Sequence, residues 1–125
     1  MKKEVVTTKN APGAIGPYSQ AVKINNLVYT SGQLPIDADT GVMPQTIEEQ
    51  TRQSLKNVEA IIKEAGSDMS KVIKTTVFLS DMNNFAKMNE VYSEFFTDAY
   101  PARSAVEVAR LPKDALVEIE VIVLI

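Results

Sequence analysis

The final segment of the chain, LVEIEVIVLI (116–125), constrains the fold most, because apolar and charged side chains alternate along it. Successive side chains of a strand point to opposite faces of a sheet, so the pattern predicts a strand over about 116–124. One face would carry Val117, Ile119, Val121 and Val123, and the other Glu118, Glu120, Ile122 and Leu124. An apolar tail should not remain in water, so we expect the second face to pack against other subunits.

Two segments have the spacing of amphipathic helices. In the first, Thr46 and Glu49 fit a capping box, and Gly66 suits the residue that follows a helix. Its inward face would hold Ile47, Thr51, Leu55, Val58, Ile62 and Ala65. The second helix is expected over about 84–97, with Phe85, Met88, Tyr92 and Phe95 inward.

The remaining segments predict short strands. Residues 19–24 and 27–31 are rich in β-forming side chains, and Asn25 and Asn26 between them suit a hairpin turn. Further strands are expected over 72–80 and 102–109. The expected order is β-β-β-α-β-α-β-β, in which the first strand is given no residue range. This order predicts a single α+β domain over residues 1–125, with a mostly antiparallel sheet and both helices on one face.

The strand within YPARSAVEVARLPKD (100–114) begins with an arginine, which is an unusual choice for a strand. Alternation places Arg103, Ala105 and Glu107 together, and we expect them on the same sheet face as Glu118 and Glu120. The guanidinium of Arg103 matches the two oxygens of a substrate carboxylate. A salt bridge to one of the three glutamates is the alternative, and spacing alone favours it.

Other polar residues have two interpretations each. Glu118 and Glu120 would supply a base that orients water, or lie on a solvated sheet face. Ser31 and Gly32 would allow a ligand to approach the backbone, or make a turn. The hydroxyl of Tyr18 would line a pocket, or its ring would simply pack. Asn89 lies beside the inward face of the second helix, so it requires either a backbone partner or a ligand.

The chain contains no Cys and no His. This composition excludes a thiolate nucleophile, a Ser-His-Asp triad, and metal sites built on Cys or His. The net charge of −3 argues against nucleic acid as a partner. No segment has the composition of a signal peptide or the length of a membrane span, so we expect a cytoplasmic protein.

Several segments together resemble the RidA (YjgF-type) family of reactive-intermediate deaminases. They are APGAIGPYSQA, SGQLPID, QTRQSLKNVEAIIKEAG, VIKTTVFLSDMNNFAKMNEVYSEFF and PARSAVEVARLPKDALVEIE, and they extend over nearly the whole chain from about Asn10. The resemblance implies a chorismate-mutase-like fold and a homotrimer with clefts between subunits. It also implies hydrolysis of 2-iminobutanoate and 2-iminopropanoate, which PLP-dependent dehydratases release with their enamine tautomers, to 2-keto acids and ammonia. No metal or cofactor is implied.

The same resemblance implies roles for individual residues. Arg103 corresponds to the residue that holds the substrate carboxylate, and Glu118 to the acidic residue that holds the attacking water. The remaining positions that line the cleft correspond to Tyr18, Ser31, Gly32, Asn89 and Ala105. The family commonly has Cys where this chain has Ala105, so regulation by oxidation of a thiol is not expected here. The resemblance gives Glu120 no catalytic role.

Two other functions remain open from the sequence. The cleft would serve a non-catalytic trimer that binds a keto acid and regulates a partner protein. An RNA-acting translation inhibitor or endoribonuclease is the other alternative, and the net charge and missing His weigh against it.

Overall fold

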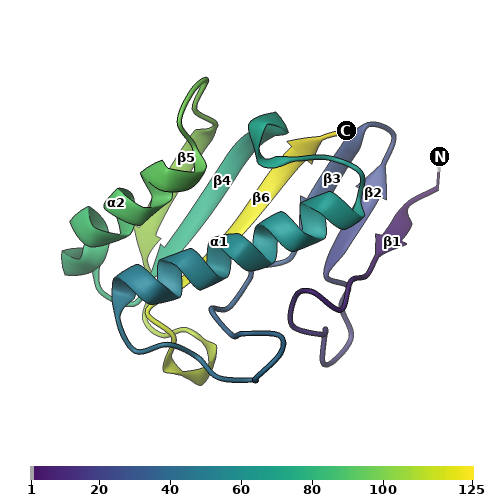
Figure 1. The fold of residues 1–125 in the computed structure, drawn as a ribbon. Helices are drawn as coiled ribbons and strands as arrows, with labels where there is room; N and C mark the ends of the chain where they lie inside the picture. Colours follow the sequence, from purple (N-terminus) through teal and green to yellow (C-terminus); the bar gives the residue numbers. More distant parts are fainter. Residues whose placement is uncertain (1) are drawn as a thin grey trace.

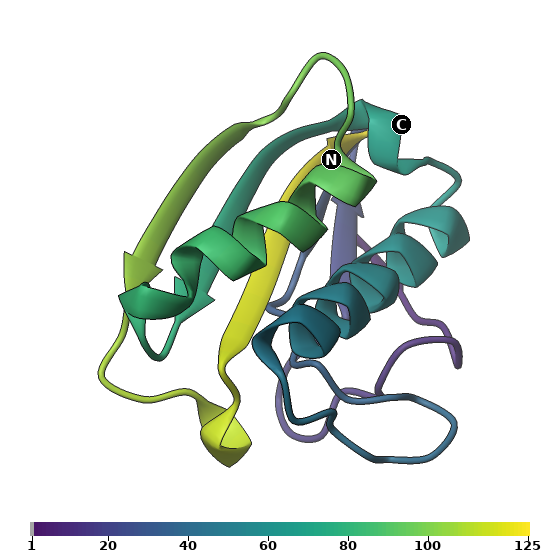
Figure 2. The same cartoon turned by 60° about the vertical axis from the view of Figure 1, so that its left-hand side comes forward.

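The computed structural model describes residues 2–125 and contains a six-stranded sheet with two helices across one face (Figures 1 and 2). The strands are β1 (Glu4–Val6), β2 (Ala21–Ile24), β3 (Leu27–Thr30), β4 (Val72–Leu79), β5 (Ala102–Glu107) and β6 (Val117–Leu124). The helices are α1 (Ile47–Glu64) and α2 (Phe85–Phe95), with short 3-10 turns at Met69–Lys71, Met82–Asn84 and Pro112–Asp114. The predicted element order and the α+β class are confirmed.

The order of strands across the sheet is β1-β2-β3-β6-β4-β5. Strands β4 and β5 run parallel, and α2 connects them, whereas the other neighbouring pairs are antiparallel. The predicted hairpin joins β2 to β3, and its Asn25 has a φ of 54°, a conformation that Asn tolerates. Strand β6 therefore lies inside the sheet, between β3 and β4, although it is the last element of the chain.

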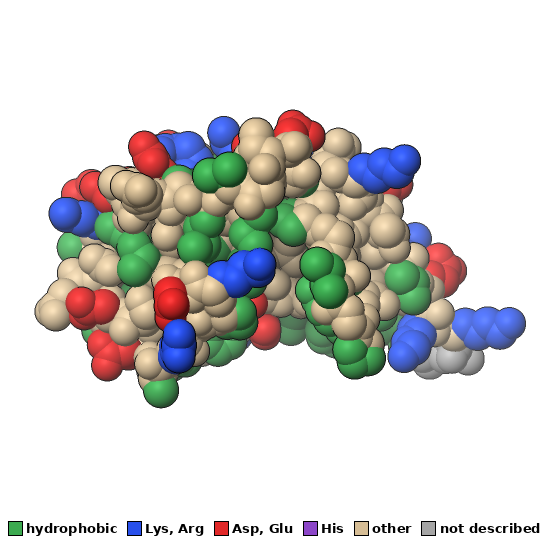
Figure 3. Space-filling model, turned by 90° about the horizontal axis from the view of Figure 1, so that it is seen from below, with side chains coloured by type: hydrophobic (Ala, Val, Ile, Leu, Met, Phe, Trp, Pro, Cys, Tyr) green, Lys and Arg blue, Asp and Glu red, His purple; other side chains and the backbone are tan. Residues whose placement is uncertain are grey.

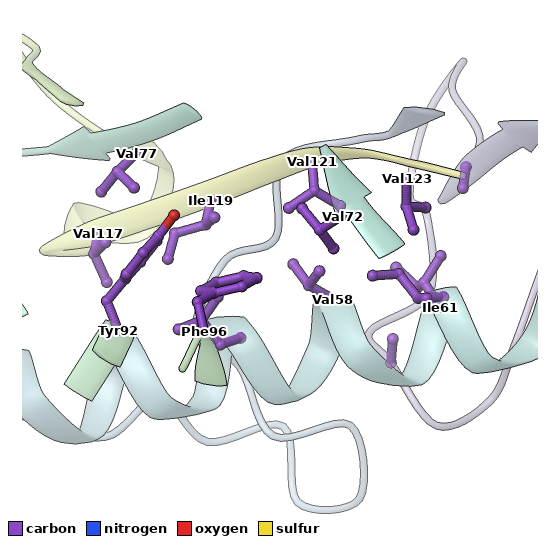
Figure 4. Packing of buried hydrophobic residues seen from close by; sticks show 14 of the residues in the cluster. Val58, Ile61, Val72, Val77, Tyr92, Phe96, Val117, Ile119, Val121 and Val123 are labelled. Carbon is purple, nitrogen blue, oxygen red and sulfur yellow. The ribbon is translucent and has the colours of Figure 1, made fainter. Parts of the chain in front are cut away.

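The core lies between the sheet and the two helices. Side chains alternate along β6 as predicted, with Val117, Ile119, Val121 and Val123 buried. Together with Val72 and Val77 of the neighbouring β4, they face Val58 and Ile61 of α1, Tyr92 of α2, and Phe96, which follows α2 (Figure 4). The predicted inward face of α1 is buried throughout, and the hydroxyl of its N-cap residue Thr46 accepts a hydrogen bond from Glu49 N–H at 3.1 Å.

The sheet face predicted for Arg103 is wrong. Strand β4 pairs with β6 on one side and with β5 on the other, so Thr75 lies opposite both Val121 and Arg103. Directly paired residues share a face, so Arg103, followed by Ala105 and Glu107, points to the helix side. The alternation within each strand is correct, but the relative phase of two strands depends on register, which the sequence did not specify.

The opposite sheet face has no helix over it (Figure 2). It carries Glu118 and Glu120 at one end and apolar side chains elsewhere. Those with large exposed fractions are Val5 (60%), Val106 (42%), Tyr29 (41%) and Leu124 (37%). We call this surface the open face. Its packing against other subunits stays a prediction.

None of the helices in the described part of the chain is long and apolar enough to cross a membrane.

Removal of each of two hydroxyl groups buried in α1 is expected to change the stability of the protein differently. Thr51 and Ser54 are both fully buried, yet Ser54 Oγ donates to the carbonyl of Gln33 at 2.7 Å and Thr51 Oγ1 has no partner among residues 2–125. We expect Ser54→Ala to lower the free energy of unfolding by about 1–2 kcal/mol. Thr51→Val should leave it unchanged or raise it, because Val has a similar shape and no hydroxyl to desolvate. Urea unfolding at one protein concentration measures both changes, and equal losses would contradict this reading.

Candidate functional site

The predicted site residues gather at two separate places in the chain. Arg103 and Asn89 line one pocket, between α2 and the start of β5. Tyr18, Ser31, Gly32 and Glu118 line another.

The guanidinium of Arg103 is held by side chains of α2. Its Nη1 donates to Asn89 Oδ1 at 2.6 Å, and its central carbon lies 4.7 Å from the ring centre of Tyr92 and 5.3 Å from that of Phe85. Aromatic faces attract a cation and restrict its position. Asn89 therefore has a side-chain partner, where the sequence left a backbone contact or a ligand open.

The salt bridge that the spacing favoured for Arg103 is absent. Among residues 2–125 the ion pairs are Arg52–Glu94 and Arg110–Asp114, so no carboxylate within the chain neutralises Arg103. Its pocket has a volume of about 470 Å³ and is completed by Tyr92, Ser93, Tyr100 and Pro101. A half-buried guanidinium without an anionic partner, facing a pocket, is suited to bind an anion.

Ala105 follows Arg103 on the same face of β5. It pairs with Val77 of β4 and packs partly buried against the core. Its methyl group therefore packs beside the arginine. Ala105 does not line the pocket around Arg103. The structure places Ala105 near the predicted anchor without giving its side chain a polar role.

Glu118 lies in a larger pocket, of about 900 Å³, at the end of the molecule where the loops after β1, β3 and β5 gather. Figure 3 views this end and shows a hollowed surface on which apolar side chains lie among acidic and basic ones. The loop before β2 contributes Ile15 and Tyr18, and the loop after β3 contributes Ile36 and Met43. The wall is therefore largely apolar around Glu118, although Asp37 and Lys113 also line the pocket.

Burial raises the pKa of the Glu118 carboxyl above its ordinary value of 4.5, and the negative charge of Glu120 on the same strand raises it further. No hydrogen bond or ion pair reaches this carboxylate from residues 2–125. Gly32 leaves room for the carboxylate in this position, because a Cβ at residue 32 would lie 2.6 Å from Glu118 Oε2 and would displace it. A carboxylate with a raised pKa and free lone pairs is suited to accept a proton from water.

The other two residues of this pocket differ in how they are held. Ser31 Oγ donates to the carbonyl of Ser19 at 2.6 Å, so its proton is used within the protein. Ser31 and Gly32 form no tight turn; they lead from β3 to Gln33, which pairs with Ile119 of β6. The side chain of Tyr18 is 54% exposed at the pocket rim. Tyr18 therefore lines the pocket without being buried in the core.

Arg103 and Glu118 cannot meet within one chain. Arg103 faces the helices, whereas Glu118 lies on the open face, because Glu118 pairs with Phe78 and Arg103 with Thr75 of the same strand. A substrate that contacts both residues must therefore lie between two copies of the chain.

Several residues that shape these pockets were not predicted from the sequence. Phe85 and Tyr92 were assigned only to the core, although they also flank Arg103. The buried polar residues of α1 were not singled out either. Their positions on the inward face of a predicted helix were a usable signal, since a buried polar group requires a partner.

No group of three or more metal-binding side chains occurs in the described part of the chain.

Comparison with known proteins identifies the family. The family model described as Endoribonuclease L-PSP matches residues 8–125. A RutC family protein of Pyrococcus horikoshii is 58% identical over 121 residues, which is 96% of each chain. The 2-iminobutanoate/2-iminopropanoate deaminase of Salmonella typhimurium is 51% identical over 122 residues, 95% of each chain. Escherichia coli TdcF, solved with bound serine, superposes with a TM-score of 0.95 at 49% identity over 98% of both chains. The chain therefore belongs to the RidA (YjgF-type) family.

Proposed function

We propose that this protein is a cytoplasmic, homotrimeric deaminase that hydrolyses 2-iminobutanoate and 2-iminopropanoate to 2-keto acids and ammonia. Relatives about half identical to this chain over nearly their whole length carry the name of this activity. The reaction requires a group that holds a carboxylate and a group that directs water, and the two pockets supply one each. In this proposal the substrate lies between the Arg103 pocket of one subunit and the Glu118 pocket of its neighbour.

The observation that carries the proposal is the unneutralised guanidinium of Arg103. Among the described residues Arg103 has an amide and two rings around it and no acidic partner, although the chain has more acidic than basic residues. Leaving a cation half-buried without a counterion is unfavourable unless a ligand supplies the negative charge. The carboxylate of a 2-imino acid would do so.

The proposed reaction needs no cofactor. Arg103 holds the carboxylate of the substrate, and the protonated imine carbon beside it is already electrophilic. Glu118 accepts a proton from water as the oxygen bonds to that carbon, which gives a tetrahedral aminoalcohol. A proton then reaches the nitrogen, with the Tyr18 hydroxyl as a candidate donor, and the proton that Glu118 accepted restores that hydroxyl. The C–N bond breaks, ammonia leaves, and the hydroxyl proton passes to solvent, which completes the keto acid. Positioning of the two reactants supplies much of the rate.

Removal of the guanidinium should abolish binding of the carboxylate. In a coupled assay, threonine dehydratase generates the imine and semicarbazide captures what has not been hydrolysed. We expect the wild-type protein to divert flux to keto acid, and Arg103→Ala to lower kcat/KM by about a hundredfold. Arg52→Ala, which removes an exposed arginine from its ion pair with Glu94, is the matched control and should retain activity. No diversion of flux by the wild-type protein would refute the proposed activity.

The same assay separates catalysis from the regulatory alternative. Glu118→Gln should lose turnover and keep its affinity for keto acids, measured by calorimetry, because the carboxylate anchor is unchanged. A protein that binds keto acids tightly and never hydrolyses imines would instead be the non-catalytic trimer.

Mixed assemblies test whether the two residues act across a subunit boundary. Arg103→Ala and Glu118→Gln chains, each inactive alone, are unfolded, mixed in equal amounts and refolded. A cyclic trimer containing both kinds of chain has one boundary with both intact residues, so random assembly should restore about a quarter of the wild-type activity. If both residues act within one chain, the mixture stays as inactive as its parents.

The pH dependence should follow the Glu118 carboxyl. Its charged form accepts the proton, so kcat should fall as pH drops through its pKa, which burial and Glu120 place above 4.5. Glu120→Gln removes the neighbouring charge and should move this fall to lower pH while activity is retained. Glu107→Gln on the other sheet face should not move it. An unchanged or raised midpoint in Glu120→Gln would contradict the assignment.

A further inference from the structure

Polar side chains of α1 hold the loop between β3 and α1 in place. Gln50, Ser54 and Asn57 are buried, and their spacing puts them on one face of the helix. Asn57 Nδ2 donates to the carbonyls of Leu34 at 3.0 Å and Ile36 at 2.9 Å. Ser54 acts on the start of the same loop through Gln33, as described above. This loop forms one wall of the Glu118 pocket.

Gln50 differs from the other two because its amide bonds in two directions. Its Nε2 donates to the carbonyl of Pro44, at the end of the loop, at 2.8 Å. Its Oε1 accepts from the backbone N–H of Leu116 at 2.8 Å. Leu116 immediately precedes β6, and its own carbonyl accepts from Ser80 N–H at 3.1 Å. The side chain of Gln50, which is 3% exposed, therefore joins the pocket wall to the start of the strand that carries Glu118.

The position of Glu118 depends on this connection. Its carboxylate lacks a polar partner among the described residues, so the backbone of β6 sets where it lies. It also lies close to Gly32, where an added Cβ would displace the carboxylate. A small shift between the loop after β3 and the start of β6 would thus change the contact between Glu118 and Gly32. It would also change the access of water to the carboxylate.

We propose that Gln50 is a positioning residue for Glu118. It fixes the first residues of β6 against the loop after β3, and so sets the location and hydration of the carboxylate without touching substrate. The amide offers both the donor that the Pro44 carbonyl requires and the acceptor that the Leu116 N–H requires. The catalytic consequence rests on the proposed function, whereas the structural link to Glu118 does not.

The test replaces the amide and observes Glu118 directly. Gln50→Met keeps the length of the side chain and loses both hydrogen bonds, and Gln50→Asn keeps an amide that is too short to span both partners. The Glu118 carboxyl is titrated by ¹³C NMR. The other titratable groups around it are Glu120 on its own strand and Asp37, Lys113 and Tyr18 on the pocket wall. Looser walls should admit water, so the pKa of Glu118 should fall toward 4.5 in both variants.

Turnover gives the second readout. In the coupled assay, kcat should fall by about tenfold or more in Gln50→Met while KM changes little, since the Arg103 pocket is intact. Val58→Ala, which opens a cavity in the core face of α1, is the control for lost stability, and Thr51→Val is the control for a change of one neighbouring residue. Both controls should keep the wild-type pKa of Glu118.

The outcomes separate this inference from the proposed function. If the pKa of Glu118 is the same in wild type and in both Gln50 variants, or if Val58→Ala shifts it equally, Gln50 has only a general structural role and the inference is overturned. If the wild-type protein does not hydrolyse imines, the proposed function fails, while the NMR titration still decides whether Gln50 positions Glu118.

Discussion

The alternation of side chains along β6 is the constraint on which the rest of the structure depends. One set of its side chains fills the core beneath both helices, and the other set forms the open face. Because β6 pairs with β3 and β4, its phase determines which face each neighbouring strand presents to the helices. The same alternation that buries Ile119 therefore places Glu118 in a pocket on the opposite side. Core packing and the candidate chemistry are two results of one strand register.

Much of the fold was predictable because local patterns specify it. The apolar face of α1, its Thr46 cap, the Asn25 turn and the buried side of β6 each depend on residues close in sequence. The phase of β5 relative to β6 was not predictable in this way. These strands do not touch; β4 lies between them, and the register of both pairings decides the face of Arg103. A shift of one residue in either pairing would have placed Arg103 on the opposite face of the sheet.

The candidate site was predictable in its residues and less so in its geometry. Of the positions that the resemblance implied, all except Ala105 line one of the two pockets, and their roles stay predictions. The resemblance did not give the contact of Arg103 with Asn89 or the absence of an acidic partner among the described residues. Those depend on how α2 packs over β5. The hydrogen bonds of Gln50 were equally out of reach, since they join residues far apart in the chain. Sequence patterns report which groups are buried, and packing decides what they meet.

The open face has a consequence for the biogenesis of the protein. Apolar residues such as Tyr29, Val106 and Leu124 are accessible in the single chain, and β6, which contributes to this face, is synthesised after the other five strands. A newly made chain would complete its core and expose an apolar surface at the same moment. In the proposed assembly, this surface is covered when chains associate with one another. Association and aggregation both become faster as the protein concentration rises, so the two processes compete. Yield of the folded protein would then be governed by how fast the chains find one another, more than by the stability of each chain.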